Sequence, residues 1–429
     1  MFSAIWARLF RLGMICTALL CFAVAVYTGV LARADWLRRN PTRDRLEEAI
    51  GLDPRNGYAY TLRAEYLERA NRTNEAEAAW GEALNYDPRN VEAWVRFALL
   101  AEGRGAIQEA ERRLLKAADL NRTWLPRWSL VNFYVRQNRT DAALLWSGLA
   151  LERASEESYA LHPLLDELAS RPYVLDHVLP ANRPVLRSYV DHLLRTKRSD
   201  GVGEAAMKLA GLIPASSADW PGTQAWLDTR AQPADDRERH VLLLAVGLLL
   251  DNQEGSSAVG LWNRMVEHGI LNAGKWSAKA PVVNNDFRGL PYGQGLDWVG
   301  NDVRGIQSER LTHEGELVVR LSGRQPNDAE IWEQRVLIPE GRTQLTIESR
   351  TEELKDGNGL EWRLSDTMGR DIASLSVPPS ADWTRSTASL PQEQGSQTLR
   401  LSLRCRRASG FIRAEGVARF RLVTVEAQK

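Results

Sequence analysis

Cysteine is scarce in this chain of 429 residues, which contains only Cys16, Cys21 and Cys405. Three cysteines cannot build a disulfide framework or a cysteine-rich metal cluster, so we expect no metal site. The HExxH, GxSxG, P-loop and GxGxxG patterns are missing from the sequence as well. Because these patterns mark common hydrolytic and nucleotide-binding sites, we expect no catalytic residues, no cofactor and no enzymatic activity.

An excess of charge of either sign is also missing, because 55 lysine and arginine residues balance 55 aspartate and glutamate residues. Proteins that coat nucleic acid need a basic excess, so nucleic acid is not an expected partner. The content of 44% hydrophobic and 26% charged residues is that of a globular protein and excludes wholesale disorder. The length allows roughly three domains of about 150 residues each.

One long segment near the N-terminus, residues 13–32, carries no charge. Twenty helical residues match the bilayer's hydrocarbon thickness of about 30 Å, which predicts a transmembrane anchor within residues 1–34. A cleaved signal peptide is an alternative, because Ala32-Arg33-Ala34 has the small-x-small pattern of a cleavage site. The apolar run is longer than the usual signal-peptide core of about 7–15 residues, so we expect the anchor to be retained.

The orientation of this anchor has conflicting signals. Two arginines precede the apolar run, and four follow it within eleven residues, namely Arg33, Arg38, Arg39 and Arg43. The positive-inside rule taken literally keeps the bulk of the chain in the cytoplasm. A short basic tail before a single span is also the layout of an exporting signal anchor. We expect a single-pass membrane protein whose bulk is periplasmic or extracytoplasmic, because of the C-terminal domain described below.

A motif recurs at a fixed distance in the first half of the chain. Asp53-Pro54-Arg55-Asn56 returns 34 residues further on as Asp87-Pro88-Arg89-Asn90. Paired alanines keep the same spacing, at positions 76 and 83 and again at 110 and 117. Alanines seven residues apart share one helix face and let a neighbouring helix approach closely. The pattern predicts repeated helix pairs over residues 35–155.

These features resemble the tetratricopeptide repeat family, with its 34-residue units, early aromatic residue, paired alanines and closing proline. The resemblance is strong over 57–90 and 91–124 and weakens in the third unit, where Arg122 replaces the proline. Residues 43–56 resemble the second helix of a truncated first unit that runs on from the membrane segment.

In this family the first helices line a concave surface that holds a peptide or protein segment. The resemblance implies a partner-binding groove lined by Tyr58, Thr61, Glu65, Glu68, Glu92, Val95, Leu99, Glu102, Ser129, Phe133 and Arg136. Four glutamates among apolar side chains favour a basic, partly apolar ligand. The alternative is a solvated helix face made of ordinary helix formers.

Helical patterning continues over residues 156–280, but the 34-residue period is lost, so we predict a degenerate helical repeat region. Residues 241–250 are apolar but too few to span a bilayer, which predicts a buried helix. We expect a linker near 271–280. This region holds the histidines at 162, 177, 192, 240 and 268. Asp176 and Asp191 each precede a histidine, but adjacent helix residues do not face each other, so we expect surface or interface histidines rather than catalytic bases.

From about residue 282 the apolar residues alternate with a period of two, and turn signals separate the alternating segments. We predict about eight strands, at 316–321, 331–338, 343–349, 360–364, 371–377, 383–390, 398–404 and 418–425. An antiparallel β-sandwich over 281–429 buries one face of each sheet. The expected fold class is α+β multidomain, with an N-terminal transmembrane helix, a tetratricopeptide-type repeat array and a jelly-roll-like sandwich.

The opening Asn284-Asn285-Asp286-Phe287, the Gly-x-x-Trp of 295–298 and the closing apolar strand resemble the jelly-roll sandwiches of carbohydrate-binding modules. Members often hold a structural calcium between an acidic residue after the opening Phe and an aspartate in the last strand. Here those places carry Arg288, Arg419 and Arg421, so we expect no calcium.

Sugar binding needs exposed flat aromatic rings that stack on apolar pyranose faces. Tyr292 and Trp298 lie in a glycine-rich loop, and they are the preferred candidates for stacking on a glycan. Trp332 lies within a strand and is ambiguous, while Trp362 has leucines on its face and is expected in the core. Burial in the sandwich core is the alternative for every tryptophan of the domain.

We therefore expect a non-catalytic, membrane-anchored scaffold that binds a protein partner in the repeat groove. Its β domain would contact a polysaccharide or a second protein, in the assembly or export of cell-envelope polysaccharide. The alternative is a carbohydrate-binding protein in which the sandwich binds glycan and the repeats act as a stalk. Both expectations depend on the resemblance of the architecture, because folds do not determine function.

Overall fold

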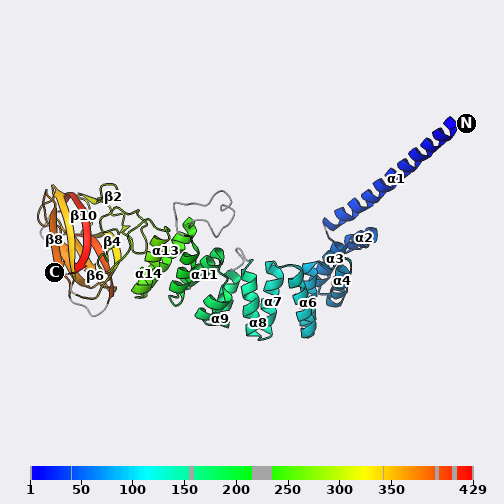
Figure 1. The fold of residues 1–429 in the computed structure, drawn as a ribbon, viewed down its shortest axis with the longest axis horizontal. Helices are drawn as coiled ribbons and strands as arrows, with labels where there is room; N and C mark the ends of the chain where they lie inside the picture. Colours follow the sequence, from blue (N-terminus) through cyan, green and yellow to red (C-terminus); the bar gives the residue numbers. More distant parts are fainter. Residues whose placement is uncertain are drawn as a thin grey trace. The chain divides into compact units, whose positions relative to one another are not determined.

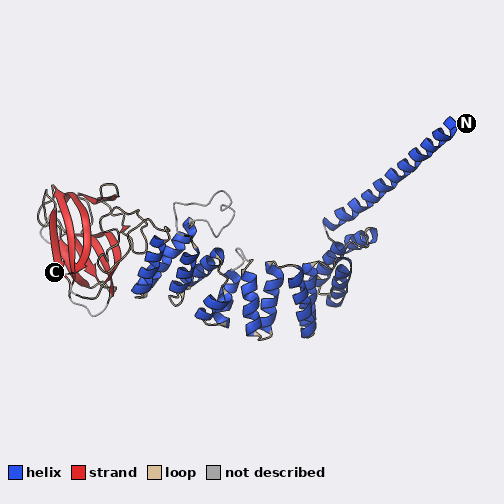
Figure 2. Ribbon diagram, viewed as in Figure 1, coloured by secondary structure: helices blue, strands red, loops and turns tan. Residues whose placement is uncertain are grey.

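The computed structural model describes residues 2–39, 41–153, 159–214, 234–341, 343–391, 396–407 and 413–427, with side chains from residue 13 onward. The chain divides into two compact units, residues 1–157 and 158–429. The first unit is helical, and the second begins with helices and continues as β-structure (Figures 1 and 2).

The first unit contains eight helices among its described residues, and they form successive antiparallel pairs. They are α1 (Phe2–Arg39), α2 (Arg43–Leu52), α3 (Gly57–Arg69), α4 (Thr73–Tyr86), α5 (Val91–Gly103), α6 (Ile107–Leu120), α7 (Trp124–Arg136) and α8 (Thr140–Leu151). Asn56 and Asn90 begin α3 and α5 as N-caps, since each side chain accepts a hydrogen bond from the backbone N–H three residues on. The predicted 34-residue helix pairs are confirmed.

The paired alanines explain the close packing of these helices. Ala76 and Ala83 of α4 are fully buried, as are Ala110 and Ala117 of α6. In the third unit Ala143 and Ala150, also seven residues apart, are fully buried as well. Methyl side chains at these positions leave room for the neighbouring helix to approach.

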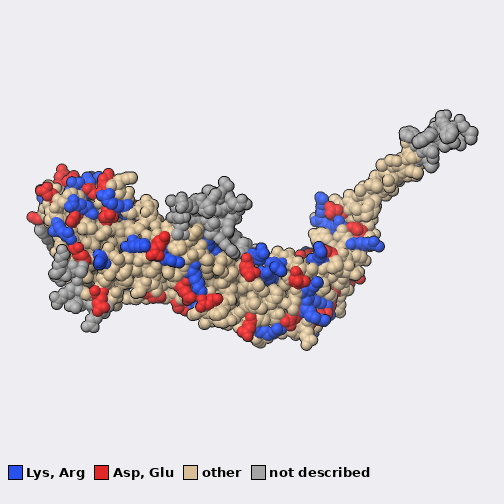
Figure 3. All heavy atoms as spheres, viewed as in Figure 1, with Lys and Arg blue, Asp and Glu red and all other residues tan. Residues whose placement is uncertain are grey.

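Helix α1 is the one helix of the described residues that is long and apolar enough to cross a membrane. The predicted span 13–32 lies within it, and Figure 3 shows no charged residue on this stretch. Its last turns pack against α2, where Ala34 and Leu37 are buried together with Leu46 and Ala49.

The second unit begins with helices that also form pairs. They are α9 (Leu161–Leu168), α10 (Arg171–Tyr173), the π-helical turn η2 (Val174–Val178), α11 (Arg183–Arg195), α12 (Val202–Leu212), α13 (Asp236–Asp251) and α14 (Gly255–Glu267). Most side chains of residues 241–250 are buried in α13, as predicted for this apolar run. Arg183 of α11 and Glu238 of α13 form a buried ion pair that joins the two helices.

Among the described residues, ten strands form two antiparallel sheets in the C-terminal part of this unit. They are β1 (Val299–Gly300), β2 (Ile306–Leu311), β3 (Glu316–Ser322), β4 (Asp328–Ile338), β5 (Thr343–Glu352), β6 (Leu360–Ser365), β7 (Asp371–Ser376), β8 (Thr384–Ser389), β9 (Gln397–Arg406) and β10 (Glu415–Ala427). The strand orders are β1-β4-β9-β6-β7 and β2-β3-β10-β5-β8. The predicted sandwich is confirmed, with β1 and β2 in addition to the eight predicted strands.

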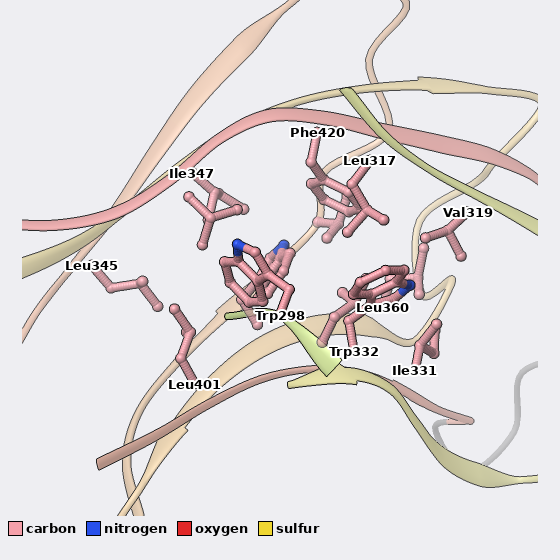
Figure 4. Close-up of a cluster of buried hydrophobic side chains, with 14 of the residues drawn as sticks. Trp298, Leu317, Val319, Ile331, Trp332, Leu345, Ile347, Leu360, Leu401 and Phe420 are labelled. Carbon is pink, nitrogen blue, oxygen red and sulfur yellow. The ribbon is translucent and has the colours of Figure 1, made fainter. Parts of the chain in front are cut away.

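Aromatic side chains fill the space between the sheets. The ring centroids of Trp298 and Trp362 are 5.5 Å apart, and those of Trp362 and Phe420 are 5.4 Å apart, both edge to face. Figure 4 shows Trp298, Trp332 and Phe420 among aliphatic side chains from both sheets. Such edge-to-face contacts add to the burial of apolar area in stabilising the sandwich.

The predicted linker near 271–280 is held by side-chain hydrogen bonds. Asn263 of α14 accepts one from the backbone of Trp276, and the Trp276 indole donates to the Leu337 carbonyl in β4. Arg335 of β4 forms an ion pair with Asp251 at 2.8 Å. This segment therefore ties the last helix pair to one edge of the sandwich.

Candidate functional site

The predicted groove residues lie on α3, α5 and α7, the first helices of three successive units. Tyr58 and Leu99 are exposed apolar side chains, with 59% and 38% of their surface accessible. Glu65 is half-buried, while Glu92 is exposed. These four residues, from two adjacent units, form a surface of mixed apolar and acidic character, which we call the α3–α5 surface.

Three predicted groove residues do not lie at the surface. Thr61 and Val95 are almost completely buried, and Phe133 is completely buried. The Thr61 hydroxyl donates to the Gly57 carbonyl and accepts a hydrogen bond from Asn90 in the next unit. The prediction was wrong for these three, because their side chains pack between helices and cannot contact a ligand.

Other groove residues are engaged in contacts of their own. Arg136 donates two hydrogen bonds to Glu102, at 2.8 and 2.7 Å. Glu68 accepts a hydrogen bond from the Trp80 indole at 2.7 Å and lies 3.8 Å from Arg96. Ser129 donates to a carbonyl of its own helix. Glu68 and Glu102 therefore have less charge to offer a ligand than the sequence suggested.

The sequence contained a signal for the Glu102–Arg136 pair that the prediction missed. These residues are 34 positions apart, which places them at equivalent sites of neighbouring units. Equivalent sites on adjacent first helices lie side by side, so opposite charges there neutralise each other.

Glu65 and Glu92 behave differently from these paired glutamates. Burial raises the pKa of the Glu65 carboxyl, and the nearby carboxylate of Glu92 raises this pKa further. The nearest cation to Glu65 is Arg69, at 3.9 Å. Among the described residues Glu92 has no ion pair within 4.0 Å. Two neighbouring carboxylates repel each other, and a cationic group of a ligand placed between them relieves this repulsion.

The histidines of the second unit do not form a catalytic site. His162 is completely buried, which differs from the predicted surface or interface position. Its Nε2 lies 2.8 Å from the hydroxyl of Ser188, which is itself buried. Nucleophilic catalysis needs a substrate within reach of the hydroxyl, and this pair has no access to one. His192 lies 3.0 Å from Asp166, another contact between helices.

Two of the three predicted stacking residues are part of the sandwich core. Trp298 is 1% exposed and donates to the Asn284 carbonyl, and Trp332 is 8% exposed and donates to the Ser308 hydroxyl. The stacking prediction is corrected for both, because neither ring face is open to a sugar. Trp362 is buried as predicted.

Tyr292 is half-buried and remains a candidate for stacking. Its hydroxyl accepts a hydrogen bond from the backbone N–H of Asn272. Its own N–H donates to Asp297, whose buried carboxylate also pairs with Arg310 at 3.0 Å. No pattern in the sequence indicates this buried ion pair, which holds the glycine-rich loop and thereby the Tyr292 ring in position.

Arginines fill the places where related sandwiches often hold calcium. The Arg288 guanidinium donates to the carbonyls of His313 and Glu314, both at 3.2 Å. Arg419 pairs with Glu316 and Arg421 with Glu348. Within the described ranges, no three His, Cys, Asp or Glu side chains gather as a metal ligand set.

Solved structures of two kinds are similar to this chain. One kind is tetratricopeptide repeat proteins. YrrB, described as having an unusual peptide-binding site, is 13% identical with a TM-score of 0.24, over 52% of this chain and 91% of its own. Pseudomonas aeruginosa PilF is 16% identical with a TM-score of 0.26, over 56% of this chain and 88% of its own.

The other kind is carbohydrate-binding modules. A module of Cellvibrio mixtus lichenase 5A, solved with cellotriose, is 15% identical with a TM-score of 0.21, over 30% of this chain and 92% of its own. At these identities the likeness concerns the fold alone. No family model and no curated protein matches the chain. The fold class predicted from sequence, a helical repeat array with a C-terminal β-sandwich, is the one observed.

Proposed function

We propose that this chain is a non-catalytic scaffold, anchored in a membrane by α1, that binds a basic protein or peptide segment on the α3–α5 surface. The observation that carries the proposal is the exposure of Tyr58, Glu92 and Leu99 on the first helices of successive units, beside the half-buried Glu65. Exposed apolar side chains beside carboxylates with weak or no ion pairing offer both contact area and charge to a basic segment.

The packing of α1 supports a retained anchor over a cleaved signal peptide. Ala34 is completely buried, and Arg33 donates to Glu48 of α2 at 2.9 Å. Cleavage after Ala34 would leave only residues 35–39 of α1 to cover the apolar side of α2. Five residues are too few to hold a stable helix, so cleavage would uncover Leu46 and Ala49.

The first prediction concerns the charge of the α3–α5 surface. Glu65→Lys together with Glu92→Lys should weaken binding of lysine- or arginine-containing peptides at least tenfold, because attraction becomes repulsion. The measurement is selection of peptides from a library of 12-residue segments on the detergent-solubilised full chain, followed by affinity measurement for the selected peptides. Glu68 and Glu102 are left unchanged, since Trp80 and Arg136 depend on them.

The matched control places the same charge change on second helices. Glu82 of α4 and Asp119 of α6 are exposed, so Glu82→Lys with Asp119→Lys alters net charge equally without touching the α3–α5 surface. The proposal requires unchanged peptide affinity in this control. Equal loss in both double variants, or no loss in either, contradicts a binding site on α3 and α5.

A second candidate function is glycan binding by the sandwich, with the repeats as a stalk. The half-buried ring of Tyr292, held in place through Asp297 and Arg310, favours it. Trp383 is a further half-buried ring, with the guanidinium carbons of Arg350 and Arg421 at 4.9 and 4.6 Å from its centroid. A scaffold with both properties would serve the assembly or export of a cell-envelope polysaccharide.

A further inference from the structure

The membrane helix and the repeat array are joined without a linker. Three residues, 40–42, separate α1 from α2, and three residues, 70–72, likewise separate α3 from α4. The last thirteen residues of α1, 27–39, therefore occupy the place that α3 occupies in the next unit. Residues 27–32 of this stretch also belong to the uncharged segment, so the span and the first repeat share one continuous helix.

The ligand-facing positions continue into this shared helix. A shift of 30 residues relates Tyr58 and Glu65 of α3 to Thr28 and Asp35 of α1. Asp35 lies three residues beyond Ala32, which is about 4.5 Å along the helix axis. The row of positions that forms the α3–α5 surface therefore begins where the chain leaves the uncharged segment.

The distance between this surface and the membrane helix is correspondingly short. Neighbouring packed helices lie about 8–10 Å apart. Helix α1 packs on α2 and α2 packs on α3, so α3 lies within about 20 Å of α1. An extended segment of roughly six residues covers such a distance at about 3.3 Å per residue. A binding segment that is itself tethered in the bilayer reaches the α3–α5 surface within a few residues of its own span.

The negative charge of this surface favours a basic peptide segment over an anionic lipid headgroup as the ligand. Glu65 and Glu92 lie at the membrane-proximal end, whereas Glu102 is paired with Arg136 one unit further along. Carboxylates repel anionic lipid headgroups but attract lysine and arginine, which are frequent beside membrane spans. Exposed Leu99 and Tyr58 add apolar contact area for a peptide chain.

We propose that the α3–α5 surface binds the juxtamembrane segment of a second membrane-spanning protein, with a lysine or arginine about six to ten residues beyond its span. This inference rests on the proposed function and adds that the partner is itself held in the membrane by a span of its own. The partner's span keeps its segment at a high local concentration near the first repeats, so binding needs only a modest intrinsic affinity.

The test raises the array above the membrane without altering the surface. Eleven helix-forming residues, Glu-Ala-Ala-Ala-Lys twice and a final Ala, are inserted between Ala32 and Arg33. Eleven residues make about three turns, so the helix face is kept and the array moves by about 16 Å. A photoreactive residue replaces Leu99 in both the parent and the raised chain. Each chain is expressed in the organism from which the protein comes, so that the natural partner is present in the membrane.

The expected result is a cross-linked adduct in the parent. The partner, identified from the adduct by mass spectrometry, should stay in the membrane when membranes that were not irradiated are extracted with alkaline carbonate. This adduct should fall at least tenfold in the raised chain. A soluble peptide selected on the α3–α5 surface should bind both chains equally, which shows that the raised array is intact. Loss of that binding on Glu65→Lys with Glu92→Lys tests the proposed function separately.

Three outcomes overturn the inference: equal adduct in the raised chain, a partner that carbonate extracts from membranes that were not irradiated, or no adduct in the parent. Each of them leaves the proposed function standing if the soluble peptide still distinguishes the charge-reversed variant from its control.

Discussion

The buried side chain of His162 makes the stability of the fold depend on pH. Burial and, to a smaller extent, the nearby His192 lower its pKa from 6.5 to about 3. The folded state thus holds the neutral imidazole, while the unfolded chain takes up a proton near pH 6.5. As pH falls from 6.5 towards 3, the unfolded state binds the extra proton, so this contribution to stability is lost by about 1.4 kcal/mol per pH unit.

We predict that His162→Gln removes part of the acid sensitivity of α9 and α11. A glutamine amide can still hydrogen-bond to Ser188 but does not titrate. Hydrogen exchange of the α9 and α11 amides, compared between pH 7 and pH 4.5, measures the change. Exposed His240, replaced in the same way, is the control and should leave the pH dependence as it was. If the two variants respond alike, burial of His162 is not the cause.

The positions of individual side chains are the part of the site that the sequence predicts least well. The glycines around Trp298 predict an exposed stacking residue, yet its indole enters the core and donates to the Asn284 carbonyl. Loop composition predicts that a segment is irregular but not which way a ring points. The groove prediction is wrong for Thr61 for a related reason. Its small side chain fits between helices, and its hydroxyl accepts a hydrogen bond from the Asn90 side chain. In both cases a contact with a residue distant in sequence determines where the side chain lies.

At the scale of helices and strands, the sequence pattern carried more information. The 34-residue spacing predicted the helix pairs because the same alanines must meet the same neighbours in each unit. Strand β2 was missed because its residues, IQSERL, have only one fully buried side chain, Ile306. Strand β1 has two residues, which is too short for any alternation to be seen.

The close approach of two helices at a glycine of the repeats leads to a prediction about their stability. A Cβ on Gly57, at the start of α3, would lie 2.7 Å from Asp87 Cβ and 3.1 Å from the Ala83 carbonyl oxygen. Gly57→Ala should therefore push α3 away from the end of α4 and destabilise the unit by about 1–3 kcal/mol. Protection of α3 and α4 amides from hydrogen exchange is the measurement.

Gly81 provides the opposite case within the same unit. A Cβ there meets no atom within 4 Å, so Gly81→Ala should stabilise α4 by about 0.5–1 kcal/mol through reduced backbone entropy of the unfolded chain. A loss of protection in both variants would mean that added methyl groups, rather than the close approach at Gly57, disturb the packing.

At the scale of the whole molecule, the side of the membrane on which the soluble units lie decides which ligands can reach them. We predict that a reporter active only outside the cytoplasm, fused after Lys429, is active in the full chain. The prediction follows from the glycan-binding role expected of the C-terminal domain, against the four arginines that follow the span. Activity leaves the glycan candidate open, because envelope polysaccharide is then within reach.

A cytoplasmic reporter fused at the same position is the complement of this measurement. Should it be the active one, the glycan candidate is excluded and the sandwich must bind another ligand. Peptide binding on α3 and α5 is independent of this outcome, since it requires only a partner on the same side.

If α1 is the proposed membrane anchor, the helix that the span shares with the first repeat has a consequence for biogenesis. In a repeat array each unit is stabilised by its neighbours, so the pairs from α3 to α8 can fold as soon as they are synthesised. Helix α2 must wait, because Leu46 and Ala49 are covered by a helix that the insertion machinery holds until the span enters the lipid. Release into the bilayer is thus the step that completes the N-terminal end of the array. A chain that fails to insert exposes this apolar face and becomes recognisable to quality control.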